Sequence, residues 1–212
     1  MTNSNKIGYL YINGLIKNKI KFIDKLVDWR WNKVGIDIQH SYTNWFDDKT
    51  IEQRIEQIVQ KVSQMLKIYD YVTIIGSSAG GSLAINAFDR LKTKNVCVVI
   101  AHGRLKVGNY TNNQKLSLYH SARIGTEHSA KSFYESVKIA EKIVIPKLSK
   151  NDKKRIFCMT QLADHVVPIN TMTISGVKTY RSLVFGHRIG FLAHIIYNRD
   201  KIIDFSQKAL LS

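Results

Sequence analysis

The sequence predicts an α/β fold, a three-layer sandwich around a mostly parallel central sheet of about six strands. Short runs rich in Val, Ile and Tyr alternate with longer amphipathic stretches along the chain. These runs are almost continuously apolar, as expected of strands that helices cover on both faces. Such alternation requires crossover connections, which are right-handed between parallel strands.

The predicted strands share this apolar composition and cover residues 7–12, 34–38, 71–75, 96–101, 155–160 and 180–185. Helices are predicted at 48–67, 78–91 and 188–210. The first helix shows the helical period best, because its apolar residues lie three and four positions apart: Ile51, Ile55, Ile58, Val62 and Met65.

The segment 103–150 is longer than a single crossover helix requires. Its part 129–145 has a helical pattern, and the remainder is polar and rich in Asn, His and Tyr. Two interpretations stay open here. The segment is either a lid over the carboxyl edge of the sheet or an ordinary surface excursion.

The composition predicts one domain over residues 1–212. The chain is 44% hydrophobic, has two prolines and carries a formal net charge of +16. Its basic residues are scattered, with no basic arm and no interleaved aromatics, so we do not expect a nucleic-acid partner. Cys97 and Cys158 lie in apolar runs and should be reduced core thiols. No apolar stretch reaches membrane-spanning length and no signal sequence is recognised, which favours a cytoplasmic protein.

The most informative local feature is a Gly-x-Ser-x-Gly pattern formed by Gly76, Ser78 and Gly80. It follows the predicted strand 71–75 and opens the predicted helix 78–91. This placement suits a strained turn that projects the serine hydroxyl above the sheet edge, with glycines where neighbouring backbone passes close. The pattern lacks the Lys-Ser/Thr ending of a P-loop and the Gly-x-Gly-x-x-Gly spacing of a dinucleotide fold. A plain Gly/Ser turn stays open as the alternative.

At this motif the chain resembles the α/β-hydrolase family, in which nucleophile, acid and histidine follow successive strands in that order. After the predicted strand 155–160 the chain reads Gln161-Leu-Ala-Asp164-His-Val-Val-Pro168, which is similar to the family's acid loop. After the predicted strand 180–185 it reads Gly186-His187, similar to the family's Gly-His. The resemblance covers most of the chain and implies a minimal version of the fold.

The resemblance implies that Ser78 is the nucleophile, Asp164 the acid and His187 the general base. His194 and His165 are competing bases. We favour His187, because His194 falls within the predicted final helix and would have to reach the sheet edge from there.

The resemblance also implies an oxyanion hole made by the backbone N–H groups of Ala79 and Leu15. Where the family often has His-Gly-x after an early strand, this chain has Asn13-Gly14-Leu15. Asn13 thus replaces the family's His, and Leu15 would supply its backbone N–H as the second donor.

Neither a cofactor nor a metal is expected. The seven histidines show no paired spacing typical of a zinc site. One minor alternative would group Glu127 with three histidines of the candidate lid: His102, His120 and His128.

Two functions follow from these observations. The favoured one is a serine hydrolase that cleaves a carboxylic ester, thioester or related acyl compound through an acyl-serine intermediate, with a small-molecule or lipid-like acyl substrate. The alternative is a non-catalytic relative whose basic surface binds nucleic acid or an anionic surface. The sequence defines neither the substrate nor the oligomeric state.

Overall fold

The computed structural model describes residues 5–15, 21–45, 47–108, 127–164, 166–187, 190 and 193–211. Over these ranges the chain forms one six-stranded sheet in which every neighbouring pair is parallel. The sheet order is β2-β1-β3-β4-β5-β6. The strands are β1 (Ile7–Ile12), β2 (Ile38–Ser41), β3 (Tyr71–Ser77), β4 (Val96–Ala101), β5 (Ile156–Ala163) and β6 (Lys178–Phe185).

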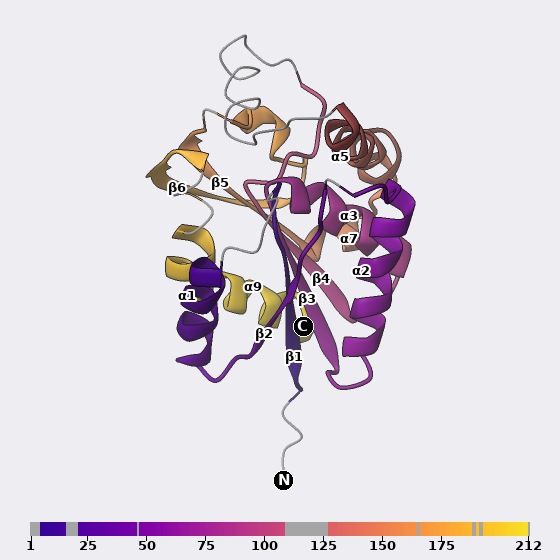
Figure 1. The fold of residues 1–212 in the computed structure, drawn as a ribbon. Coiled ribbons are helices and arrows are strands. Elements are labelled where there is room, and N and C mark those ends of the chain that lie inside the picture. Colours follow the sequence, from indigo (N-terminus) through magenta and orange to yellow (C-terminus); the bar gives the residue numbers. More distant parts are fainter. Residues whose placement is uncertain are drawn as a thin grey trace.

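Helices cover both faces of this sheet, as Figure 1 shows. One face carries α1 (Lys21–Asn32), the π-helical turn η3 (Ala193–Tyr197) and α9 (Arg199–Leu211). The other carries α2 (Ile51–Met65), α3 (Ala79–Leu91), α5 (Glu127–Ile139) and the π-helical segment η1 (Ala140–Val144). Shorter helical pieces complete the described chain: α6 (Ile145–Lys147), α7 (Lys150–Lys154) and the 3-10 turn η2 (Ile169–Thr171). The predicted three-layer α/β sandwich is confirmed.

Strands β1, β3, β4 and β5 each contribute to two apolar cores, because successive side chains of a strand point to opposite faces of the sheet. In β1, Leu10 and Ile12 pack toward α2 and α3, whereas Tyr9 and Tyr11 pack toward α1 and α9. All four side chains are at most 3% exposed. The almost unbroken apolar composition of the predicted strands therefore reflects burial on both sides.

The prediction of a strand at 34–38 is wrong in position, because β2 begins only at Ile38. Helix α1 ends in a tight turn instead. The Trp31 carbonyl accepts hydrogen bonds from the N–H groups of Val34 (3.0 Å) and Ile36 (3.3 Å). Gly35 closes the turn with a φ of +73°, a conformation that glycine adopts without strain. The apolar residues that suggested a strand belong to this helix end.

The segment 103–150 divides into two parts. Its second part contains α5, η1 and α6, and this helical stretch packs on the sheet as an ordinary crossover. Phe133 and Val137 are buried in the same core as α3, and Asn86 of α3 donates a hydrogen bond to the Ser136 carbonyl at 2.9 Å. Residues 109–126 of this segment lie outside the described residues, so the interpretation of 103–150 as a lid stays a prediction.

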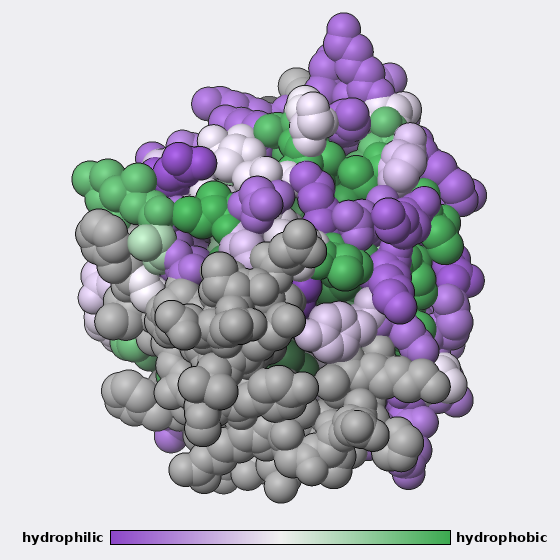
Figure 2. Space-filling model, turned by 90° about the horizontal axis from the view of Figure 1, so that it is seen from above, coloured by the Kyte–Doolittle hydropathy of each residue, from purple (hydrophilic) through white to green (hydrophobic). Residues whose placement is uncertain are grey.

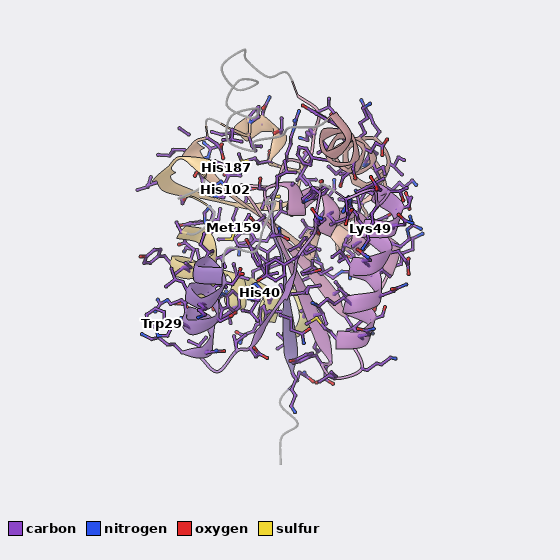
Figure 3. All side chains as sticks on the ribbon, viewed as in Figure 1. Trp29, His40, Lys49, His102, Met159 and His187 are labelled. Carbon is purple, nitrogen blue, oxygen red and sulfur yellow. The ribbon has the colours of Figure 1, made fainter. Side chains whose placement is uncertain are left out.

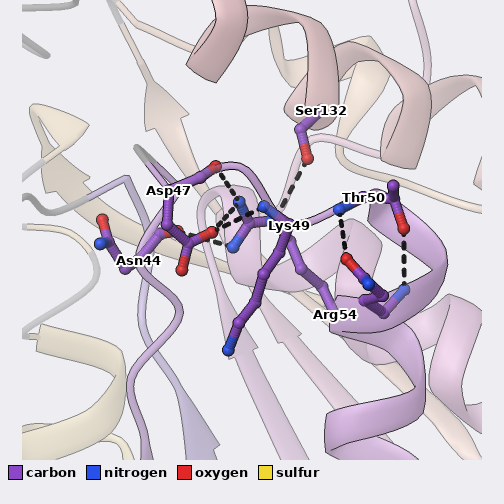
Figure 4. Close-up of polar contacts among 7 residues, drawn as sticks. Asn44, Asp47, Lys49, Thr50, Arg54 and Ser132 are labelled. Atoms are coloured by element: carbon purple, nitrogen blue, oxygen red, sulfur yellow. Dashed lines mark hydrogen bonds and ion pairs between the residues drawn. The ribbon is translucent and has the colours of Figure 1, made fainter.

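A buried arginine connects α2 to the segments beside it (Figure 4). Arg54 is 2% exposed and donates to the Asn44 carbonyl at 2.6 Å, the Asp47 carboxylate at 2.7 Å and the Ser132 hydroxyl at 3.2 Å. Its charge is therefore paired, as a buried cation requires. These contacts join the loop after β2 to α5 across the start of α2, where Thr50 forms a capping box.

Two further predictions from the sequence concern the cysteines and membrane-spanning segments. Cys97 and Cys158 are buried free thiols, and burial raises the pKa of Cys97 to about 11 and that of Cys158 to about 12. In the described ranges, no helix combines the length and the apolar character needed to span a bilayer.

Candidate active site

Ser78 lies in the turn between β3 and α3, at the carboxyl edge of the sheet. Its backbone angles are φ 52° and ψ −118°, a strained conformation for a residue other than glycine. The Ser78 N–H donates to the Ala101 carbonyl of β4 at 3.0 Å, and the Ser78 carbonyl accepts from Gly81 N–H at 3.0 Å. Hydrogen bonds to the neighbouring strand β4 and to α3 thus hold the strained turn in place.

The two glycines of the motif are required by close backbone approach. A Cβ atom on Gly80 would lie 2.6 Å from the Ile12 carbonyl oxygen and 2.7 Å from that of Asn13. A Cβ atom on Gly76 would collide with the Gly80 carbonyl and lie 2.7 Å from Cβ of Ala84. The helix can therefore begin immediately at the serine only because both positions lack a side chain.

The structure brings Ser78, His187 and Asp164 together, although they lie on three separate loops. The Ser78 hydroxyl is 2.9 Å from His187 Nε2, and His187 Nδ1 is 2.7 Å from Asp164 Oδ2. A proton can thus pass from the hydroxyl to a ring whose far nitrogen is held by a carboxylate. Figure 3 places His187 at the upper end of the sheet, above Met159 of β5.

Asp164 follows the last residue of β5, and its side chain is oriented by its own loop. Its Oδ1 accepts hydrogen bonds from the N–H groups of Val166 (2.8 Å) and Val167 (2.9 Å). Burial alone would raise the pKa of this carboxyl. The imidazoles of His102 and His187 and the Val167 amide outweigh burial and hold the pKa well below its usual value. Asp164 is therefore a carboxylate over the whole physiological pH range.

His187 is placed by the turn after β6. Gly186 has a φ of +89° and donates its N–H to the Ala163 carbonyl at 3.3 Å, which ties the ends of β5 and β6 together. His187 is 8% exposed. The Gly-His pair thus turns the ring back over the sheet edge toward Ser78.

The two candidate oxyanion donors flank the serine. Ala79 is the first residue of α3, so its N–H is one of the groups that a helix start leaves without an intrahelical acceptor. Leu15 follows Gly14, whose own added Cβ would lie 2.9 Å from Cβ of Ser78. Asn13 fixes this loop, because its Oδ1 accepts the Thr43 N–H at 2.8 Å. The oxyanion role of both backbone groups stays a prediction.

Of the two competing bases, the structure describes His194, whose hydrogen bonds go to Thr160 and Asn198 rather than to Ser78. His194 lies in η3 and is fully buried, with Nε2 donating to the Thr160 carbonyl at 3.1 Å and Nδ1 accepting from the Asn198 amide at 3.3 Å. Burial, aided by the nearby His102, lowers its pKa to about 3. His194 is therefore a neutral structural residue, whereas His165 lies outside the described residues.

His102 is the site residue that the sequence interpretation missed. It was grouped with a candidate lid, yet it directly follows β4 and is fully buried, with Nδ1 3.6 Å from Asp164 Oδ2. Its position at a strand end, like that of Ser78, Asp164 and His187, was the available signal. The other members of that minor grouping, His120 and the side chains of Glu127 and His128, lie outside the described residues.

Three of these residues also offer ligand atoms within 4.8 Å of one another, namely His102, Asp164 and His187. Two of the three, Asp164 and His187, are already joined by a 2.7 Å hydrogen bond. A metal ion would have to displace that bond, so the geometry favours the relay over a metal centre.

Comparisons with known proteins give a fold and no sequence family. The sequence matches no family model and no curated protein. A lipase-esterase related protein from Clostridium acetobutylicum ATCC 824 is 13% identical, with a TM-score of 0.56, and the match covers 96% of this chain and 94% of that one. The chain has the α/β-hydrolase fold.

Further solved structures with this α/β-hydrolase fold have equally low identity. An esterase from Pyrococcus furiosus is 13% identical with a TM-score of 0.56, covering 99% of this chain and 84% of that chain. A meta-cleavage product hydrolase from Pseudomonas fluorescens IP01 is 15% identical with a TM-score of 0.56, covering 97% and 92%. The chain thus spans nearly the full length of hydrolases that share its fold.

Proposed function

We propose that the protein is a serine hydrolase that cleaves a carboxylic ester, thioester or related acyl compound through an acyl-serine intermediate. The observation that carries this proposal is the unbroken relay from Ser78 Oγ through the His187 ring to Asp164, with contacts of 2.9 and 2.7 Å. The solved structures of the same fold, which are described as esterases, lipases and related hydrolases, support it.

In the acylation step, Ser78 Oγ attacks the acyl carbon while His187 Nε2 takes its proton. The carbonyl oxygen becomes an oxyanion beside the N–H groups of Ala79 and Leu15. Asp164 remains ionised and stabilises the imidazolium. The imidazolium then gives the same proton to the leaving alkoxide or thiolate, and the alcohol or thiol departs.

The second half of the reaction returns the serine. His187 takes a proton from water, and the resulting hydroxide attacks the acyl carbon of the ester on Ser78. When the tetrahedral intermediate collapses, the bond to Ser78 Oγ breaks and this oxygen recovers the proton from His187. The carboxylic acid leaves, and the enzyme is back in its starting state.

Two large apolar side chains are exposed on β5 and β6. Leu162, two residues before Asp164, is 41% exposed, and Leu183 on β6 is 78% exposed. Figure 2 views this end of the molecule and shows green apolar groups among purple polar ones over its coloured part.

A panel of p-nitrophenyl esters of increasing acyl length tests the proposal. Wild type should turn over at least one of them, and Ser78→Ala should lower kcat/KM by about 10³-fold or more, because the nucleophile is lost. The neighbouring Ser77, 2% exposed on β3, provides the matched control. Ser77→Ala should stay within about tenfold of wild type, as expected of a residue that does not act as nucleophile. Equal rates for wild type and Ser78→Ala would refute the assignment.

A basic groove supports the alternative, a non-catalytic binding function. A groove of about 910 Å³ near the amino ends of β3, β5 and β6 is lined by six basic residues and no acidic one: Lys94, Lys153, Lys154, Arg155, Lys178 and Lys208. If the ester panel shows no turnover and the protein is retained on DNA in a salt-dependent way, the binding function is favoured instead.

A further inference from the structure

His102 is held in an unusual state directly beneath the proposed relay. Its side chain is 0% exposed, and neither ring nitrogen has a hydrogen-bond partner among the described residues. Its φ is +53°, a conformation that residues other than glycine seldom adopt. Burying an unpaired polar group costs about 1 to 3 kcal/mol, so a residue retained in this state calls for an explanation.

The ring of His102 is clamped by its neighbours. It stacks on the His194 ring with centroids 4.5 Å apart and meets the edge of the His187 ring at 6.1 Å. A Cβ atom on Gly190 would lie 2.8 Å from Cε1 of His102. Figure 3 shows His102 directly below His187. The ring can therefore shift only slightly, and a slight shift is enough to reach Asp164.

The charges around His102 decide which nitrogen carries its proton. The titratable groups that face it are Asp164, His187 and His194, with Tyr180 beyond His194. Burial lowers the pKa of His102, so its ring is neutral and has one N–H. The Asp164 carboxylate lies near Nδ1, and the Gly190 backbone also faces the ring. Because a carboxylate attracts an N–H more strongly than a neutral carbonyl does, the tautomer with the proton on Nδ1 is favoured.

We propose that His102 is a positioning residue of the proposed relay, which offers its Nδ1–H as a second donor to Asp164 Oδ2. The inference rests on the proposed function, since the relay is what His102 would tune. The distance of 3.6 Å is too long for a hydrogen bond at rest. In this buried site of low dielectric, an N–H at this distance still attracts the carboxylate in the free enzyme, and the attraction increases if the contact shortens when substrate is bound.

A second donor would divide the attraction of the carboxylate between two imidazoles. Without the His102 donor, Asp164 would act on His187 alone and favour its imidazolium form more strongly. His187 would then stay protonated, and unable to accept the Ser78 proton, up to a higher pH. The acid limb of the kcat/KM profile should therefore move upward when this donor is removed.

Three variants separate the donor from the bulk of the ring. In His102→Asn the amide nitrogen takes the place of Nδ1, and Asn tolerates a positive φ. His102→Gln places its amide nearer the position of Nε2, and His102→Leu has no donor. We expect the acid limb to rise by about 0.5 to 1 pH unit in the Leu and Gln variants, and to stay near the wild-type position in the Asn variant.

A spectroscopic measurement tests the same point without turnover. The proton between His187 Nδ1 and Asp164 gives a downfield NMR signal, assigned by its loss in His187→Ala. A charge-assisted hydrogen bond strengthens when its acceptor loses a competing donor. This signal should therefore lie further downfield in His102→Leu and His102→Gln than in the wild type, and near the wild-type chemical shift in His102→Asn. If His102→Leu does not fold, the wild type is compared with His102→Gln and His102→Asn alone.

These measurements distinguish failure of the inference about His102 from failure of the proposed function. If the acid limb and the downfield signal are the same in all folded variants, His102 has only a structural role and the inference is overturned, even if kcat falls. If both readouts follow the presence of the donor, the inference is supported. If wild type is inactive on all esters, the proposed function fails, and the NMR comparison still decides whether His102 acts on the Asp164–His187 pair.

Discussion

Asp164→Asn should lower kcat/KM by about 10⁴-fold while leaving the protein folded, by comparison with the same change in other triads. In the wild type, Oδ1 accepts two backbone N–H groups, from Val166 and Val167. The Asn oxygen would keep those bonds, and its NH₂ group would then face His187 Nδ1. The His187 ring would be forced to carry its proton on Nε2, which leaves no lone pair for the Ser78 hydroxyl.

The rate of ester hydrolysis and the thermal stability of the wild type and Asp164→Asn should be measured on the same preparations. Thermal unfolding should show a native Asp164→Asn protein, because its backbone hydrogen bonds are retained. A variant that is folded and within about tenfold of wild type would show that Asp164 does not orient the base.

Gly80→Ala should reduce the free energy of unfolding by about 3 kcal/mol or more. The new methyl group would lie 2.6 and 2.7 Å from two carbonyl oxygens at the end of β1. That backbone cannot retreat easily, because β1 is hydrogen-bonded to β2 on one side and β3 on the other. The clash should also displace the loop carrying Leu15, so ester hydrolysis should fall with stability.

Gly35→Ala is the matched control for this steric argument. A Cβ atom there would meet nothing within 4 Å, although its φ of +73° disfavours a side chain. It should cost only about 1 kcal/mol. Urea unfolding of both variants compares the two effects, and equal losses of stability would contradict the requirement for close approach at Gly80.

The sequence was sufficient to predict most strands of the sheet, because strands that are buried on both faces are almost continuously apolar. The runs at 7–12 and 96–101 coincide with β1 and β4, and each is almost entirely apolar. The position of β2 was missed for a physical reason. Val34 and Ile36 are apolar residues of a helix-ending turn, and local composition does not distinguish such a turn from a short strand.

The candidate site could be assembled from sequence because parallel strands end at the same edge of the sheet. Ser78, Asp164 and His187 each follow a strand, and topology brings those ends together. His102 obeys the same rule after β4. It was missed because the chain beyond it is polar, and the histidine was assigned to that excursion. Its burial depends on η3 and β5, which sequence spacing does not define.

Covalent labelling with a fluorophosphonate, followed by mass spectrometry of the resulting peptides, tests the existence of an activated hydroxyl most directly. We expect a single stoichiometric adduct on Ser78 that Ser78→Ala abolishes and that forms far more slowly in His187→Ala. Labelling of wild type and Ser78→Ala to the same extent, or no adduct on this residue in the wild type, would contradict it.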